Sequence, residues 1–200
     1  MQPTTAKIVL FLSLIGAALL LITCAQSGSG DQPLTQEQLV KRGEYLVTIG
    51  GCNDCHSPKK FGPKGPEPDP SILLSGHPAN AGVPELVPGI PNPAGWMAAC
   101  NAHMTAWVGP WGISFAANLT PDSQTGIGDW EEADFIKAMR TGQHLGMGRD
   151  ILPPMPWQSI GKSTDADLKA IFAYLKSLPA IPNLVPGPIP PPQSEAPAHN

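Results

Sequence analysis

The sequence contains few charged residues and no cluster of basic ones. Charged residues make up 14% of its 200 residues, and the formal net charge is −4. Nucleic-acid binding requires a basic patch, so this function is excluded and we expect no nucleic-acid partner. Aromatic residues are also scarce, at 6%, although five of them are Trp.

Regular secondary structure is limited by Pro and Gly. The chain has 25 Pro and 21 Gly, a proportion that argues against a regular α/β enzyme. Both residues are frequent in residues 57–127, where proline prevents helix formation. We therefore interpret 57–127 as a long loop over the core, with room for a short hairpin near Trp107 to Ala116.

The first 23 residues have the pattern of a secretory signal. Lys7 precedes an apolar run from Ile8 to Ile22, too short to span a bilayer of about 30 Å as a helix. The run leads to Cys24 and resembles a bacterial lipoprotein signal, in which this Cys is lipidated. Cleavage after Ala25 and an uncleaved anchor are the alternatives, and all three place the remaining chain outside the cytoplasm.

Three later segments have helical periodicity and start signals. Residues 35–50 and 164–178 each begin with a Thr that can cap the first turn, and residues 129–142 begin with an Asp. A Ser/Gly-rich tether covers residues 24–34. We expect one domain over residues 35–179 and a disordered, Pro-rich tail over 180–200.

The strongest chemical signal is the motif Cys52-Asn53-Asp54-Cys55-His56. C-x-x-C-H is the pattern of covalent haem c attachment: two thiols reach the two vinyl groups of one haem, and the adjoining imidazole becomes an axial iron ligand. The motif occurs once, so we expect one covalently bound haem. A zinc site shared with Cys100 and His103, or a redox dithiol, is the alternative interpretation.

Met155 is the best candidate for the second axial ligand. Pro153, Pro154 and Pro156 surround it and restrict the backbone, so the thioether can be held at low entropic cost. Met ligation gives a high-potential electron carrier. The other residues considered are Met97, Met104, Met139, Met147, His77, His103, His144 and His199.

The order of these features resembles the class I cytochrome c family. The stretch "GISFAANLTPDSQTGIGDWEEADFIKAMRTG", followed by "LPPMPW", is similar to membrane-bound bacterial cytochromes c and to the cytochrome subunits of periplasmic dehydrogenases. The resemblance implies an all-α fold with a long Pro/Gly-rich loop insertion. It also implies a close crossing of the first and last helices, for which Gly43 and Tyr174 match.

The same resemblance implies that a proline carbonyl accepts the free N–H of His56, and Pro63 and Pro66 are the candidates. Trp130 and Trp157 either cover the haem or pack in the core. Cys100 is left without a partner; we expect a buried thiol or an intermolecular bridge, and a copper site with His103 and Met104 is a further alternative.

We therefore predict an electron carrier, not an enzyme, on the periplasmic side of a bacterial membrane. Cys52, Cys55, His56 and Met155 bind the haem, and Cys24 carries the lipid. The expected partners are redox proteins: a quinol-oxidising complex, a dehydrogenase or a terminal oxidase. The alternatives are an electron-accepting subunit of a periplasmic dehydrogenase, and a haem enzyme or gas sensor with an open iron site.

Overall fold

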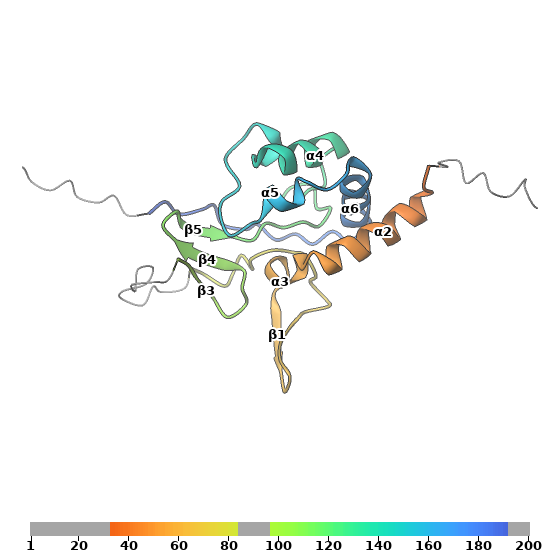
Figure 1. Cartoon of the computed structure of the whole chain (residues 1–200). Coiled ribbons are helices and arrows are strands. Elements are labelled where there is room, and N and C mark those ends of the chain that lie inside the picture. The colour runs from red at the N-terminus through yellow and green to blue at the C-terminus, as the bar shows by residue number, and fades with distance from the viewer. Residues whose placement is uncertain (1–32, 84–96, 192–200) are drawn as a thin grey trace, which may run out of the picture. The chain divides into compact units, whose positions relative to one another are not determined.

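The computed structural model describes residues 33–83 and 97–191 (Figure 1). The predicted signal, Cys24 and most of the tether therefore lie outside the described residues. The elements, in chain order, are α2 (Gln36–Ile49), α3 (Cys52–His56), β1 (Lys59–Gly62), β2 (Gly65–Pro68), β3 (Ala99–Cys100), β4 (Ala106–Gly109), β5 (Gly112–Phe115), α4 (Glu132–Thr141), the 3-10 turn η2 (His144–Gly146), α5 (Trp157–Ile160) and α6 (Asp165–Ser177). No helix in the described part is long and apolar enough to span a membrane.

The prediction of an all-α fold is wrong, because the Pro/Gly-rich region forms two antiparallel sheets. The first pairs β1 with β2, and the second has the order β3-β4-β5. β4 and β5 pair from Ala106↔Phe115 to Gly109↔Gly112, where the hairpin was expected. Proline excludes a helix here but is tolerated on the edges of a small sheet. In β2, for example, Pro66 and Pro68 pair with Phe61 and Lys59.

The helix starts follow the capping signals, with one shift. The Thr35 hydroxyl accepts a hydrogen bond from the Gln38 N–H at 3.3 Å, and the Gln38 side chain accepts from the Thr35 N–H at 2.8 Å. This reciprocal capping box satisfies two free donors at the start of α2. By contrast, α4 begins three residues later than the predicted Asp129, with Glu131 as its N-cap.

The core lies where α2, α4 and α6 meet. Its buried members are Val47, Leu74, Ile127, Phe135, Ala138, Met139, Leu168, Phe172 and Leu175. Gly43 brings α2 against α6, because a Cβ at this position would overlap the Ala170 carbonyl and lie 2.7 Å from the Tyr174 Cβ. The close crossing expected at Gly43 and Tyr174 is therefore present.

The chain after α6 is extended, and it is bonded to the domain. The sequence predicts disorder from residue 180, whereas residues 180–191 run back across the domain to β5 (Figure 1). Ile189 and Ile113 exchange backbone hydrogen bonds at 2.8 and 2.9 Å. Pro-rich sequence favours an extended backbone, and these tertiary contacts hold the extended segment in place. Residues 192–200 lie outside the described part.

Candidate functional site

The C-x-x-C-H motif forms a single helical turn directly after α2. Gly51 joins α2 to α3 with a φ of 65°, a left-handed conformation that glycine adopts without steric cost. On the following turn, Cys52, Cys55 and His56 occupy positions i, i+3 and i+4, which share one face of a helix. Both thiols are free and partly buried. The three residues predicted to bind haem are thus brought together.

Neither of the two alternatives, a redox dithiol or a zinc site, is supported by this environment. Burial raises the pKa of both the Cys52 and the Cys55 thiol, and the Asp54 carboxylate adds to the effect at Cys55. A redox-active dithiol needs a lowered pKa. Across residues 33–83 and 97–191, no three His, Cys, Asp or Glu side chains are grouped to hold a metal ion. Cys100, expected to be either a buried thiol or part of an intermolecular bridge, is exposed, so the first of these expectations is wrong.

His56 is held with one ring nitrogen bonded and the other free. Its Nδ1 lies 2.8 Å from the Ala117 carbonyl oxygen, and a carbonyl only accepts, so Nδ1 carries the proton. Burial lowers the pKa of the ring, which keeps it neutral. Nε2 makes no hydrogen bond in the described part of the chain. Because no fully buried side-chain nitrogen or oxygen in that part lacks a partner, Nε2 is not fully buried. Its lone pair is therefore open to a ligand, which is what an iron ligand requires.

The carbonyl that orients His56 differs from the one expected. Pro63 and Pro66 belong to the β1–β2 hairpin, at its turn and on β2, whereas the acceptor is Ala117, 61 residues from His56 in the chain. Residues 116–119 follow β5, and their backbone groups bond to Leu74, His77 and Thr105, which brings the Ala117 carbonyl to the His56 ring. No spacing rule near the motif signals this contact, because only the path of the long loop creates it.

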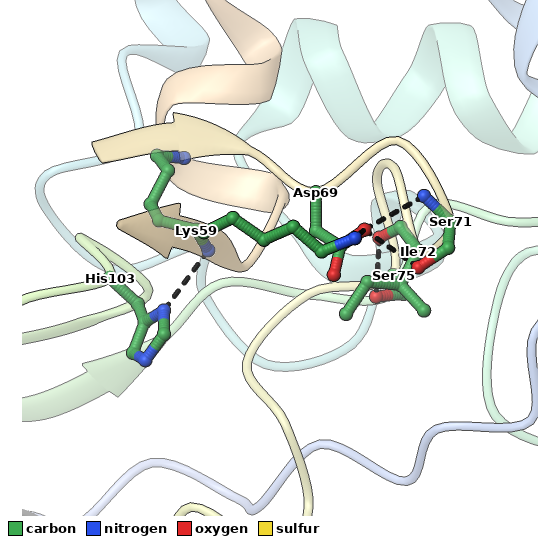
Figure 2. A network of polar contacts seen from close by, with 7 residues as sticks. Lys59, Asp69, Ser71, Ile72, Ser75 and His103 are labelled. Carbon is green, nitrogen blue, oxygen red and sulfur yellow. Dashed lines mark hydrogen bonds and ion pairs between the residues drawn. The ribbon is translucent and has the colours of Figure 1, made fainter. Parts of the chain in front are cut away.

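Sequence reasoning also missed Lys59, which caps the end of α3. Its Nζ donates to the carbonyls of Asn53, Asp54 and Ser57 at 2.8, 2.9 and 2.7 Å, and the residue is only 7% exposed. A cation at this end satisfies the last carbonyls and complements the helix dipole. Burial lowers the pKa of the ammonium group. The Lys59 backbone N–H donates to the His103 Nδ1 at 3.0 Å (Figure 2).

The neighbouring turn is organised by Asp69 (Figure 2). Its carboxylate accepts from the Ser71 hydroxyl at 2.6 Å and pairs with the Lys60 ammonium at 2.9 Å. These contacts, the Ser71 hydroxyl first, lower the pKa of Asp69 to about 2. The Asp69 N–H also donates to the Pro58 carbonyl at 2.8 Å, so the turn closes the hairpin that follows the motif.

Met155 lies in a loop that is attached to β5. The Pro153 carbonyl accepts from the Ser114 hydroxyl at 2.6 Å, and that hydroxyl accepts from the Trp111 indole N–H at 3.2 Å. Met155 is half-buried, and both it and Cys52 pack against the same core cluster. Met155 and Cys52 thus border the same hydrophobic core.

Several of the other candidate ligands have partners or positions that do not suit ligation. Both ring nitrogens of the buried His77 are within hydrogen-bond distance of a partner, the Thr105 hydroxyl and the Gly82 carbonyl. His103 uses Nδ1 to accept from Lys59. Met139 is part of the core, and Met97 and Met147 are 76% and 75% exposed. His199 lies outside the described residues.

The two tryptophans considered as a haem cover both contact protein groups. Trp130 packs edge-on against the His144 ring, with centroids 5.0 Å apart. The Trp157 ring lies against Gly142, at the end of α4. These contacts are those of ordinary side-chain packing.

Comparison with known proteins confirms the resemblance to cytochromes c. The chain is 34% identical over 138 residues to the gluconate 2-dehydrogenase cytochrome c subunit of Pantoea cypripedii, an alignment covering 69% of this chain and 23% of that protein. It is 31% identical over 142 residues to the fructose dehydrogenase cytochrome subunit of Gluconobacter japonicus (70% and 22%), and 31% over 146 residues to the quinone-dependent alcohol dehydrogenase cytochrome c subunit of Gluconacetobacter polyoxogenes (72% and 25%). No family model matches the chain.

The matched stretch is a small part of each of these relatives. The alignment spans a quarter or less of the length of the three proteins named above. The chain is thus homologous to one portion of dehydrogenase cytochrome subunits, and the match covers about 70% of its own residues.

Proposed function

We propose that this homologue of dehydrogenase cytochrome c subunits is a monohaem c-type cytochrome that transfers single electrons. The observation that carries the proposal is the state of His56. Its ring directly follows two free thiols and is fixed through the Nδ1 contact with Ala117, and Nε2 has no hydrogen-bond partner among the residues that the structure describes. Cys52 and Cys55 would form the two thioether bonds, and His56 would bind iron through Nε2. Bound haem supplies an iron that gains or loses one electron at a time.

Met155, in the loop before α5, completes the proposed ligand set. The bond from Ser114 to the Pro153 carbonyl positions the loop, and the proline-rich backbone limits its movement. A thioether is a soft ligand that favours the ferrous state, so it raises the reduction potential. Retention of both ligands keeps the iron closed to small molecules, which favours electron transfer over catalysis.

A dehydrogenase is the proposed electron donor. The relatives are named as cytochrome subunits of gluconate and fructose dehydrogenases, and the net charge of −4 suits docking on a basic surface of a partner. A quinol-oxidising complex and a terminal oxidase complete the set of proposed redox partners. We place the domain on the periplasmic side of the membrane, held there by a lipid on Cys24.

The first experiment asks whether the mature protein carries haem. The purified chain should be red and heavier by one haem, and Cys52→Ala should lose one thioether bond. Cys100→Ala is the matched control, because this thiol is exposed and outside the motif, and it should retain both bonds. A colourless wild-type protein without added mass would refute the function.

The second experiment tests the Met155 ligand. Met155→Ala should lose the weak ferric charge-transfer band of iron–thioether bonding, and its ferrous form should bind carbon monoxide. Met147→Ala is the control, since that side chain is 75% exposed, and its spectrum should match the wild type. Ready binding of carbon monoxide by the wild type at neutral pH would instead support an open iron site.

The third experiment tests the subunit role. Affinity purification of the native protein from its own membranes should recover a large dehydrogenase subunit, and substrate of that dehydrogenase should reduce the haem. Recovery of the cytochrome alone, with reduction only by a quinol-oxidising complex, would favour an independent shuttle.

A further inference from the structure

The extended segment after α6 contacts both chain segments that hold His56. Residues 181–189, called the strap below, leave the C-terminal end of α6 and cross to β5 (Figure 1). The proposed ligands do not involve the strap. Besides the backbone bonds of Ile189 to Ile113, its hydrogen bonds are made at Ile181 and Asn183.

Both polar atoms of the Asn183 side chain form hydrogen bonds that join the strap to residues 75–79. Its amide nitrogen Nδ2 donates to the Ser75 carbonyl at 2.7 Å and to the His77 carbonyl at 2.9 Å. Its Oδ1 accepts from the Ala79 N–H at 2.9 Å. The backbone N–H of Asn183 donates to the Thr125 hydroxyl at 3.0 Å, so this residue also connects to the turn that follows Asn118.

Ile181 joins the strap to the segment 116–120. Its carbonyl accepts from the Asn118 side-chain amide at 2.8 Å, and its N–H donates to the Thr120 hydroxyl at 3.2 Å. Asn118 is 4% exposed and Thr120 is fully buried. The Asn118 Oδ1 also accepts from the Thr120 N–H and hydroxyl at 3.0 and 2.7 Å, which closes a buried polar network around the strap.

These two segments are the ones that bond to His56. The Gly76 N–H donates to the His56 carbonyl at 2.8 Å, and the Ala117 carbonyl accepts from the ring at 2.8 Å. One segment therefore positions the His56 backbone and the other orients its imidazole. A backbone bond of 2.9 Å between the His77 N–H and the Ala116 carbonyl ties the segments to each other.

We propose that Asn183 is a positioning residue for the axial histidine, acting through the 75–79 and 116–120 segments. This inference rests on the proposed function, since it takes His56 as an iron ligand. The strap fixes the distance between the Gly76 N–H, which donates to the His56 carbonyl, and the Ala117 carbonyl, which accepts from the His56 ring. The imidazole then keeps one orientation, with a full Nδ1–H bond to Ala117 that raises the basicity of Nε2 toward the iron.

The test compares full-length haem-loaded wild type, Asn183→Ala and Leu184→Ala. Leu184 is the matched control, because it is the next strap residue and its side chain is 70% exposed. Asn183→Ala leaves the Ser75 and His77 carbonyls without their donor, so amide exchange at Gly76 should accelerate about tenfold or more. The His56 Nδ1 proton should exchange faster as well, and the midpoint potential should rise, since a weaker bond to Ala117 makes the imidazole a poorer donor to ferric iron. Leu184→Ala should change none of these quantities.

Equal exchange and equal midpoint potential in Asn183→Ala and Leu184→Ala would overturn the proposal. If Asn183→Ala does not fold, Thr125→Val is measured in the same way: it removes the hydroxyl that accepts from the Asn183 N–H and the Asn118 amide and donates to Asp122, so it loosens the strap while keeping the Asn183 side chain. A wild-type chain without haem would refute the proposed function instead. Gly76 exchange in that haem-free chain would still decide whether the strap holds the segment.

Discussion

The close approach of α2 and α6 at Gly43 makes a quantitative prediction about stability. In Gly43→Ala, the new methyl group would overlap the Ala170 carbonyl and lie 2.7 Å from the Tyr174 Cβ. Because the first obstacle is helix backbone, α2 must move away from α6. The packing of Val47 and Leu168, which are 1% and 0% exposed, would loosen with it.

Two opposing effects determine the size of the loss. Alanine favours the helix over glycine by about 1 kcal/mol. Overpacking typically costs about 1–3 kcal/mol, and a backbone clash belongs at the upper end of that range. We therefore expect Gly43→Ala to lower the free energy of unfolding by about 2 kcal/mol. For a domain of this size, the midpoint temperature should fall by about 4–8 °C.

Denaturant unfolding of the haem-loaded protein measures this difference directly. Gly62→Ala and Gly187→Ala are the controls, because a Cβ at either position has nothing within 4 Å, and both should stay within about 0.5 kcal/mol of wild type. A Gly43→Ala protein as stable as the wild type, or more stable, would refute the argument that Gly43 sets the distance between α2 and α6.

Two further predictions concern the polar groups next to the motif. Lys59→Met should remove the donor shared by the carbonyls of Asn53, Asp54 and Ser57 and destabilise the protein by about 1–3 kcal/mol, with less haem attached in the purified protein. Lys60→Met removes an ion pair whose Lys side chain is 62% exposed, so it should destabilise the protein less. Equal losses would contradict the capping role. Asp69 should titrate near a pKa of about 2, below its ordinary 3.8, so its stabilising contribution is present above about pH 4 and is lost as the pH falls toward 2. An NMR titration of Ser71→Ala should show the Asp69 pKa moving back toward 3.8, and an unchanged pKa would rule out the hydroxyl as its main cause.

Local signals predicted the helices well, because the signals act within one or two turns. The Thr35 capping box and the C-x-x-C-H turn depend only on near neighbours, and both are present. The start of α4 is displaced because Asp129 was only one of several acidic residues able to cap. Glu131 takes that role, with the Asp134 carboxylate accepting from its N–H at 3.0 Å.

The long Pro/Gly-rich region was predicted least well. Its lack of helix was foreseen, and so was the hairpin near Trp107. The all-α assignment failed because Pro and Gly exclude helices without excluding short edge strands. The Lys59 cap was missed for a related reason: nothing in a basic residue three positions after His56 shows that its ammonium turns back onto the preceding carbonyls.

By itself, the sequence predicted the candidate haem-binding residues and determined which segments are helical, since both follow from spacing along the chain. The tertiary structure decided which carbonyl holds His56 and what the segment after α6 does. Ala117 reaches the ring from 61 residues away, and Asn183 reaches Ser75 across 108. Such contacts depend on the path of the loops and on the need to pair every buried polar group. Both of these depend on the whole fold.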